Sequence, residues 1–473
     1  MPRIGFRSLT RVLTRASLLL ALVPACGDDT SADGNADDIG PDGGVTITSD
    51  GSGTAESGDS SGSSGSTDNG TGSSEDNGTG SSDSNTTSSG DSADGGPKFD
   101  LGKLGDAGVG NCEGMGGGGD EWSYIWVANS SEGTISKVNT VTLVEEGRYR
   151  TRADNLGSPS RTSVNLTGDV AVANRESSVT KVIAVHENCD EMHNGQPGLQ
   201  TSSGKNDVLA WGQDDCVAWN TPFDGFNTQR PIAWTSGVLN PNTCAVEDQF
   251  VWTAAAQHNV AGSTHVFRIN GDDGTVDEDI PIPQIGGGYF GPYGGAVNSE
   301  NDFWFVTYDT SQLVRVDFET LVYDIYPVQA GCPYGFTVDS LDRPWIGEFC
   351  SGSAVFDPDT QQWTSIPGVL GYGLQEDDNE VMWIGTFSPP GLRGVNIQTL
   401  QEVKWIMLPT QSSRGVSVDF QGYVWFVDMQ TSAWRVDTDA ETWQAYSGLN
   451  GPYTYSDMTG HGLQIVSGGI PQG

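Results

Sequence analysis

The stretch of sequence that decides the fold is Pro333-Tyr-Gly-Phe-Thr-Val-Asp-Ser-Leu-Asp-Arg-Pro-Trp-Ile-Gly-Glu348. It reads as a short apolar strand, an acidic residue with a tight turn, and a second short strand that carries a tryptophan. The second strand recurs along the chain, and its tryptophan serves as a marker. The copies of the marker are Trp126, Ala171 (in place of tryptophan), Trp252, Trp304, Trp345, Trp383 and Trp425.

The spacing of the markers indicates a repeat protein. Successive markers lie 45, 81, 52, 41, 38 and 42 residues apart. A period of about 40 residues with four short strands per unit is typical of a β-propeller. Helical periodicity is absent throughout. We therefore predict an all-β fold, a seven-bladed β-propeller of four-stranded blades, over residues 121–473.

A polar residue six positions before the marker predicts how the first hairpin of a unit turns. This residue is Asn165, Asn298, Asp339, Asp377 or Asp419, and its side chain can cap the turn into the marker strand. At the C-terminus, Pro452-Tyr-Thr-Tyr-Ser-Asp-Met-Thr-Gly460 repeats the first strand of the other units, whereas the first unit lacks one. We expect this segment to complete the first blade and close the ring.

The interval of 81 residues in the second unit contains an insertion at roughly residues 186–206, between the third and fourth strands. Six cysteines follow Cys26, and an even number in an exported domain predicts up to three disulfides. Cys332 and Cys350 lie symmetrically about a predicted hairpin turn and should face each other. Cys189 with Cys216 would staple the insertion, which leaves Cys112 with Cys244 by elimination.

The N-terminus has the pattern of an export signal. Four arginines and no acidic residue precede the apolar run from Ala16 to Val23, which is too short to span a bilayer but suits a signal peptide. The run ends in Leu22-Val-Pro-Ala-Cys26, which resembles a bacterial lipobox. The resemblance implies a lipoprotein signal peptide over residues 1–25 and lipidation of Cys26. The alternative is an ordinary secretory signal with a chance cysteine.

Residues 26–120 are predicted to be a disordered tether. The segment is rich in Ser, Gly and Asp, and residues 26–100 contain 16 acidic residues against one basic residue, Lys98. Such a composition cannot bury enough apolar surface to offset chain entropy. With a lipid on Cys26, the tether would place the propeller in the bacterial cell envelope, at the outer membrane, either periplasmic or surface-exposed. The net charge of −40 disfavours nucleic acid as a partner.

The repeat unit, Gly-x-Pro-Tyr-Gly…Asp…Trp-Phe…Val-Asp…Tyr-x-x-x-Pro, resembles that of the streptogramin (virginiamycin B) lyase family. The resemblance implies a seven-bladed propeller that opens a cyclic depsipeptide by magnesium-assisted elimination. The family's catalytic histidine lies in a Pro-His-Gly motif, but the corresponding motifs here contain Tyr293, Tyr334, Tyr372 and Arg414. Without that imidazole no general base is evident, and we assign no catalytic residue.

Chain geometry gathers the starts of first strands and the ends of marker strands on one face of the ring, its mouth. We predict ligand-binding residues there, because aromatic faces with a few carboxylates and amides suit a binding surface. These are Tyr293, Tyr334, Tyr372, Tyr453, Arg414, Glu348 and Asp428, near Asn129, Asn174 and His258. The alternative is that the tyrosines merely plug the channel. The five histidines read as scattered surface residues rather than metal ligands.

Two functions from different classes follow. The first is a lipid-anchored, extracytoplasmic module that binds a small molecule, a glycan or a protein at the mouth and contacts the membrane through its N-terminal lipid. The second is a lyase or hydrolase that uses Glu348, Asp428 or a bound divalent metal, magnesium or calcium. A mainly structural role in the envelope is a third hypothesis, and fold alone does not choose among them.

Overall fold

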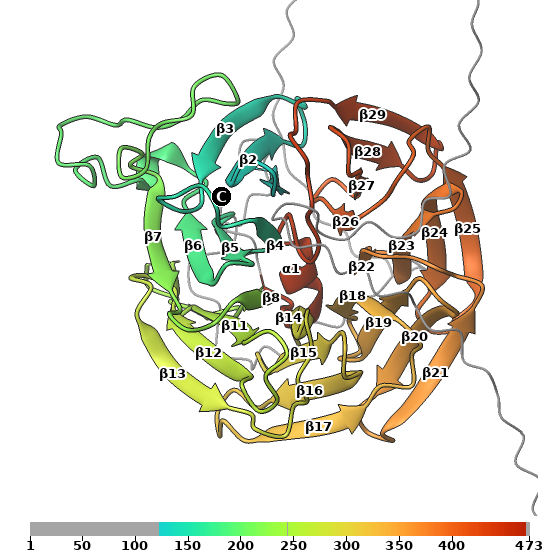
Figure 1. The fold of residues 1–473 in the computed structure, drawn as a ribbon. Coiled ribbons are helices and arrows are strands. Elements are labelled where there is room, and N and C mark those ends of the chain that lie inside the picture. The colour runs from blue at the N-terminus through green and yellow to red at the C-terminus, as the bar shows by residue number, and fades with distance from the viewer. Residues whose placement is uncertain (1–122, 244, 470–473) are drawn as a thin grey trace, which may run out of the picture. The chain divides into compact units, whose positions relative to one another are not determined.

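The computed structural model describes residues 123–243 and 245–469, which form seven blades around a common centre that we call the channel (Figure 1). The seven-bladed, almost entirely β fold predicted from the marker spacing is confirmed. In each blade the strands are antiparallel neighbours, and the innermost strand lies beside the channel. Hydrophobic side chains between adjacent sheets build the core, including the buried tryptophans Trp126, Trp252, Trp304, Trp345 and Trp425.

The first four blades contain strands with the following bounds. Blade 1 has β1 (Tyr124–Asn129), β2 (Thr134–Asn139) and β3 (Glu145–Arg150), and blade 2 has β4 (Pro159–Val164), β5 (Val170–Asn174), β6 (Ser178–Val182) and β7 (Val217–Pro222). Blade 3 has β8 (Thr228–Trp234), β11 (Phe250–Ala256), β12 (His265–Asn270) and β13 (Val276–Pro281), with the separate hairpin β9 (Val238–Leu239) and β10 (Val246–Glu247). Blade 4 has β14 (Pro292–Val297), β15 (Phe303–Thr307), β16 (Gln312–Val316) and β17 (Tyr323–Pro327).

The last three blades are regular. Blade 5 has β18 (Pro333–Val338), β19 (Pro344–Glu348), β20 (Gly352–Asp357) and β21 (Gln362–Pro367). Blade 6 has β22 (Leu374–Glu376), β23 (Val381–Phe387), β24 (Pro390–Asn396) and β25 (Glu402–Met407). Blade 7 has β26 (Gly415–Val418), β27 (Val424–Val427), β28 (Ala433–Asp437) and β29 (Thr442–Tyr446).

The C-terminal segment closes the ring, as the repeat pattern predicts. Pro452 forms an antiparallel bridge with Asn129 at the end of β1. The N–H of Tyr453 donates to the carbonyl of Ala128 (3.1 Å), and the N–H of Trp126 donates to the carbonyl of Met458 (2.9 Å). Residues 452–458 therefore take the inner position of blade 1, beside three strands from the other end of the described chain.

A short helix, α1 (His461–Ser467), follows this segment and was not predicted. With seven residues it is too short to show helical periodicity in the sequence. Leu463 and Val466 are buried, and α1 contacts the inner strands β18, β22 and β26. Among residues 123–243 and 245–469, no helix has the length and hydropathy required to cross a bilayer.

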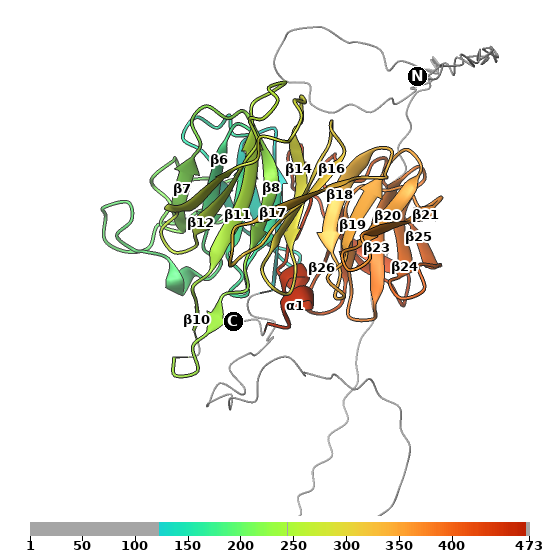
Figure 2. The ribbon, with the colours of Figure 1, turned by 90° about the horizontal axis from the view of Figure 1, so that it is seen from below.

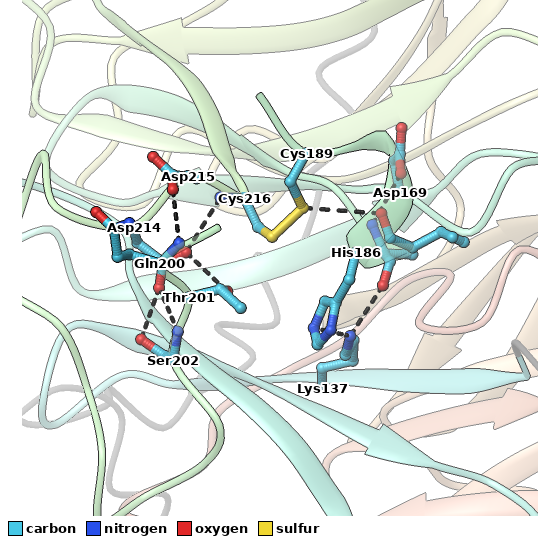
Figure 3. The surroundings of a disulfide bond; sticks show 12 residues. Lys137, Asp169, His186, Cys189, Gln200, Thr201, Ser202, Asp214, Asp215 and Cys216 are labelled. Carbon is cyan, nitrogen blue, oxygen red and sulfur yellow. Dashed lines mark hydrogen bonds between the residues drawn. A yellow bond between two sulfur atoms is a disulfide. The ribbon is translucent and has the colours of Figure 1, made fainter. Parts of the chain in front are cut away.

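The insertion occupies residues 183–216 between β6 and β7 and protrudes from the outer side of blade 2 (Figure 1). It contains a single 3-10 turn, η1 (His186–Asn188). The predicted disulfide between Cys189 and Cys216 is present, with the two Cα atoms 4.7 Å apart (Figure 3). The side chains of Asp214 and Asp215 accept backbone hydrogen bonds from Ser202 (2.9 Å) and Gln200 (2.7 Å), respectively. Buried carboxylates and a disulfide therefore hold the insertion, which lies away from the channel.

Lys137 on β2 anchors the start of the insertion to blade 1. Its ammonium group donates to the carbonyl of Ala184 (2.8 Å) and lies 3.3 Å from Nε2 of His186 (Figure 3). Burial lowers the pKa of Lys137 to about 8, although Glu146 and Asp214 oppose the shift.

A repeated cap holds the inner hairpins. The side-chain oxygens of Asn165, Asn298, Asp339, Asp377 and Asp419 accept hydrogen bonds from the backbone N–H groups two and four residues later. Where the cap is aspartate, its second oxygen also accepts the indole N–H of the marker, at 2.7 Å in each of three blades. At Asn298 the buried indole of Trp304 has no acceptor among the described residues. Aspartate thus joins the turn to the tryptophan, which asparagine does not.

Neighbouring blades are linked by a second repeated contact. A side chain of one blade accepts both the N–H and the hydroxyl of a serine in the preceding blade. Asn301 binds Ser236 in this way (2.8 and 3.2 Å), Asp342 binds Ser299 (2.8 and 2.7 Å), and Glu376 binds Ser340 (2.7 and 2.7 Å). Such contacts fix the rotation of one blade against the next. Burial raises the pKa of Glu376 to about 7.

The aspartate cap generates the first prediction. In Asp339→Asn the buried oxygen that binds both Trp345 and the guanidinium of Arg343 (2.6 Å) loses its charge. Removing one partner of such a contact should lower the free energy of unfolding by about 2–4 kcal/mol. Urea denaturation measures the change, with Asp359→Asn, an exposed aspartate of the same blade, as control. An equal loss of unfolding free energy in both variants would contradict the role of Asp339 as a cap.

The second prediction concerns the pH dependence of stability. Because the folded pKa of Glu376 lies above its unfolded value of 4.5, the folded state binds more protons between pH 4.5 and 7. This group's contribution to stability is therefore largest at low pH and falls as pH rises through that range. The unfolding free energy of Glu376→Gln minus that of the wild type should therefore increase by about 2–3 kcal/mol from pH 5 to pH 8, because the wild type loses this stability and the variant does not. Denaturation at both pH values tests this, with Glu319→Gln at an exposed position as the control, and a difference that stays constant for Glu376→Gln would refute it.

Candidate ligand site at the channel mouth

One end of the channel, the mouth, is where the inner strands begin. There the first residue of an inner strand pairs with the last residue of the marker strand in the same blade, as Pro159 with Asn174, Pro292 with Thr307, and Pro333 with Glu348. Figure 2 shows α1 at one end of the inner strands. Because α1 follows the end of the last inner segment, it lies at the end opposite the mouth.

Tyrosine side chains fill the channel just inside the mouth. The predicted residues Tyr293, Tyr334, Tyr372 and Tyr453 come together there with Tyr455, and all five are buried. The hydroxyl of Tyr453 lies 3.0 Å from that of Tyr293 and 2.5 Å from that of Tyr334, which also accepts from Tyr455 (2.5 Å). We call these five residues the tyrosine cluster. Its geometry supports the interpretation of the rings as a plug.

Partly exposed apolar side chains form a rim over the tyrosine cluster. The rim consists of Phe290, Tyr308, Phe349, Phe387 and Met429, from successive blades 4 to 7. Phe290 and Tyr308 have ring centroids 5.0 Å apart, and Phe387 lies 5.0 Å from Tyr372. Tyr308 and Phe349 directly follow a marker strand, and Phe387 is the last residue of one. That position is a sequence signal which could have identified them.

Four arginines surround the tyrosine cluster, whereas the sequence analysis named only Arg414. The guanidinium carbon of Arg414 lies 4.5 Å from the ring centroid of Tyr372. Arg161 lies 3.9 Å from Tyr455, and Arg230 and Arg175 lie 5.2 and 5.0 Å from Tyr293 and Tyr453. Arg414 is therefore not a lone cation. Four arginine side chains thus gather near the mouth of a chain whose net charge is −40.

The two predicted carboxylates at the mouth are buried and cap turns. Glu348 accepts hydrogen bonds from the N–H of Gly331 (2.8 Å) and the hydroxyl of Ser351 (2.8 Å). Asp428 accepts three backbone N–H groups, from residues 430 to 432, and the indole of Trp434 (3.0 Å). Both side chains therefore already have a structural role in their own turns.

The neighbouring polar residues divide into two kinds. The amides of Asn129 and Asn174 are buried and bind side chains of their own hairpins, Ser136 (2.8 Å) and Ser178 (3.0 Å). His258 lies at the rim, where its ring stacks on that of the exposed Tyr289 with centroids 4.6 Å apart. Of these groups, His258 is the one placed to meet a ligand.

One histidine corrects the expectation of scattered surface residues. His461 is only 1% exposed, because it begins α1 and α1 packs into the far end of the channel. Desolvation lowers its pKa. Neither of its ring nitrogens has a hydrogen-bond partner among the described residues.

The second predicted disulfide lies at the rim. Cys332, directly before β18, is bonded to Cys350, just beyond β19, with Cα atoms 5.6 Å apart. It thus fixes the segments that carry Tyr334 and Phe349. The predicted pair of Cys112 and Cys244 lies outside the described residues, as do Cys26, the signal peptide and the tether.

No group of three or more His, Cys, Asp or Glu side chains suited to a metal ion occurs in the part of the chain that the structure describes. The magnesium or calcium considered from the sequence therefore has no assigned ligands.

The fold and the site together define a seven-bladed β-propeller with a tyrosine-plugged channel, a cationic mouth and an aromatic rim. Among solved structures, the chain is similar to a streptogramin B lyase, with 14% identity, a TM-score of 0.48, and coverage of 65% of this chain and 88% of that one. A catalytically inactive virginiamycin B lyase from Staphylococcus aureus with quinupristin matches at 13% identity and a TM-score of 0.42, over 61% and 84% of the two chains.

A protein of unknown function from Desulfotomaculum acetoxidans also matches, at 10% identity and a TM-score of 0.48, over 71% of this chain and all of that one (100%). No protein-family model matches the sequence, and neither does any curated protein. No activity follows from these similarities.

The hydroxyl chain of the tyrosine cluster generates the third prediction. Tyr334→Phe removes the hydroxyl that joins Tyr453 to Tyr455, and should lower the free energy of unfolding by about 1–2 kcal/mol because buried donors lose a partner. Thermal unfolding followed by near-ultraviolet circular dichroism measures the effect. Tyr289→Phe, at a side chain that is 51% exposed, is the control and should change little. If Tyr334→Phe unfolds at the same temperature as the wild type, the chain of hydroxyls does not stabilise the plug.

Proposed function

We propose that the protein is a ligand- or protein-binding module whose ligand sits on the mouth of the propeller. The single observation that carries this proposal is the arc of partly exposed apolar side chains, Phe290, Tyr308, Phe349, Phe387 and Met429, above a rigid, buried tyrosine cluster. A preformed aromatic surface with a few polar groups suits recognition, since its side chains lose little conformational freedom on binding.

The same proposal places the propeller in the bacterial cell envelope. A lipid on Cys26 would hold the chain to a membrane, and the acidic segment up to residue 120 would separate the propeller from the lipid surface. Like charges along that segment favour its extension. The anchor would then confine the mouth to ligands that reach the envelope.

The alternative, a metal-assisted lyase or hydrolase, has weaker support. Glu348 and Asp428 are the carboxylates at the mouth, and each is already bound to N–H or hydroxyl donors of its own turn. The positions that hold the family's histidine carry tyrosine and arginine. Incubation with quinupristin and magnesium, followed by mass spectrometry, discriminates the two functions, because ring-opened product would refute a role in binding only.

The fourth prediction concerns the rim. In a thermal-shift screen of aromatic small molecules, cyclic and linear peptides and oligosaccharides, at least one class should raise the melting temperature of the full chain. The double variant Phe349→Ala/Phe387→Ala, which truncates the rim, should lower the affinity for that ligand at least tenfold, since contact area is lost. Trp405→Ala is the matched control, because Trp405 lies on the outer strand β25 and is 41% exposed. A ligand lost in the control but kept in the rim variant would place the site elsewhere.

The fifth prediction concerns the anchor. Cys26→Ala should abolish incorporation of labelled palmitate in bacterial cells and move the protein from the membrane to the soluble fraction, because the lipid would have no attachment site. Cys112→Ala serves as control and should keep both the label and the membrane association. Label that persists in Cys26→Ala would refute the lipid anchor.

A further inference from the structure

Three buried arginines, Arg161 on β4, Arg230 on β8 and Arg414 before β26, lie against the tyrosine cluster. Their exposed fractions are 1%, 4% and 7%. Arg161 and Arg230 share the ring of Tyr293, with guanidinium carbons 4.8 and 5.2 Å from its centroid, and Arg414 lies 4.5 Å from that of Tyr372. One connected group of rings therefore holds three positive charges out of water.

None of these three arginines forms an ion pair with any described residue. Both terminal nitrogens of Arg161 lack a hydrogen-bond acceptor there, as does Nε of Arg230 and of Arg414. The contacts that do exist are to neutral oxygens. Arg230, for example, donates to the hydroxyl of Thr228 (2.8 Å) and the carbonyl of Phe290 (3.0 Å).

Such an arrangement is costly without a counter-charge. Burial strips a guanidinium of its hydration, and proteins retain buried charges where they are paired. Elsewhere the chain follows this rule, since Arg343 pairs with Asp339 (2.6 Å) and Arg148 with Glu145 (2.8 Å). Contacts with ring faces recover only part of the lost hydration. Because arginine does not release its proton, an anion has to supply the balance.

We propose that an oxyanion group, such as a carboxylate, sulfate or phosphate, binds at the mouth against the two terminal nitrogens of Arg161, with Arg230 and Arg414 adding to its attraction. The planar guanidinium matches two oxygens of such a group. This inference rests on the proposed binding function and names the chemistry of the ligand. The ligand pairs an acidic group, held by arginine, with an apolar or aromatic body that packs on the rim.

The oxyanion has two sources that the experiment must separate. One is a ligand from outside the chain. The other is the acidic sequence before β1, where Asp106, Glu113, Asp120 and Glu121 supply carboxylates. An external oxyanion would find the site unfilled in the isolated protein, whereas a carboxylate of this segment would already occupy it.

The experiment measures the melting temperature of the full chain in potassium phosphate and in potassium sulfate, with potassium chloride holding the ionic strength constant. We expect a rise that saturates with oxyanion concentration. Arg161→Gln should reduce the apparent affinity at least tenfold and, without oxyanion, should melt at or above the wild-type temperature because it removes an unbalanced charge. Arg393→Gln is the control, since Arg393 pairs with Glu402 on the outer wall (2.7 Å) and should keep the wild-type response.

A second variant, Asp106→Asn/Glu113→Gln/Asp120→Asn/Glu121→Gln, separates the sources. If the ligand comes from outside the chain, oxyanions raise the melting temperatures of the wild type and of this variant by the same amount. If the chain's own carboxylates fill the site, oxyanions do not raise the melting temperature of the wild type. The variant then melts at a lower temperature than the wild type, and oxyanions raise its melting temperature. The first result supports the proposal, and the second overturns it because the charge is then balanced within the chain.

The proposal is overturned if neither protein responds to oxyanions, or if Arg161→Gln responds like the wild type. It is also overturned if Arg161→Gln melts well below the wild type in chloride alone, since the charge would then be balanced within the fold. A neutral ligand that needs Phe349 would, in any of these cases, leave the binding function intact and refute only the acidic group. Failure of every rim-dependent ligand would instead refute the function itself.

Discussion

The structure depends on the pairing of residues 452–458 with β1. Every other blade is continuous in sequence, whereas blade 1 is assembled from the two ends of the described chain, so the ring exists only when this contact forms. The closing segment also supplies Tyr453 and Tyr455 to the tyrosine cluster. Closure and the completion of the mouth are therefore one event, and a molecule with an open ring would have neither a sealed sheet nor a finished site.

The acidic residues of the propeller are used mainly at its turns and between its blades. Asp339, Asp377 and Asp419 each hold a turn and an indole, and Glu376 holds the preceding blade. Glu348 and Asp428 serve similar turns at the mouth. The arginines beside the tyrosine cluster therefore lie near carboxylates that are already bound to their own turns.

The sequence predicted those features that depend on local, repeated pattern. Marker spacing gave the blade number, the polar residue before each turn gave the cap, and symmetry about one turn gave Cys332 with Cys350. It did not predict α1, because seven residues are too few for a helical period. It also missed Arg161 and Arg230, because an arginine in a strand usually points to solvent, and only the closed ring directs both into the channel. The rim was also missed, although Tyr308 and Phe349 directly follow marker strands and could have been identified by that position.

The position of α1 at the far end of the inner strands closes the centre of the propeller at the end opposite the mouth. Leu463 and Val466 pack there against strands of several blades. Since the tyrosine cluster fills the centre just inside the mouth, side chains close it at both ends. Blades from different parts of the ring are thus joined at two levels along the central axis.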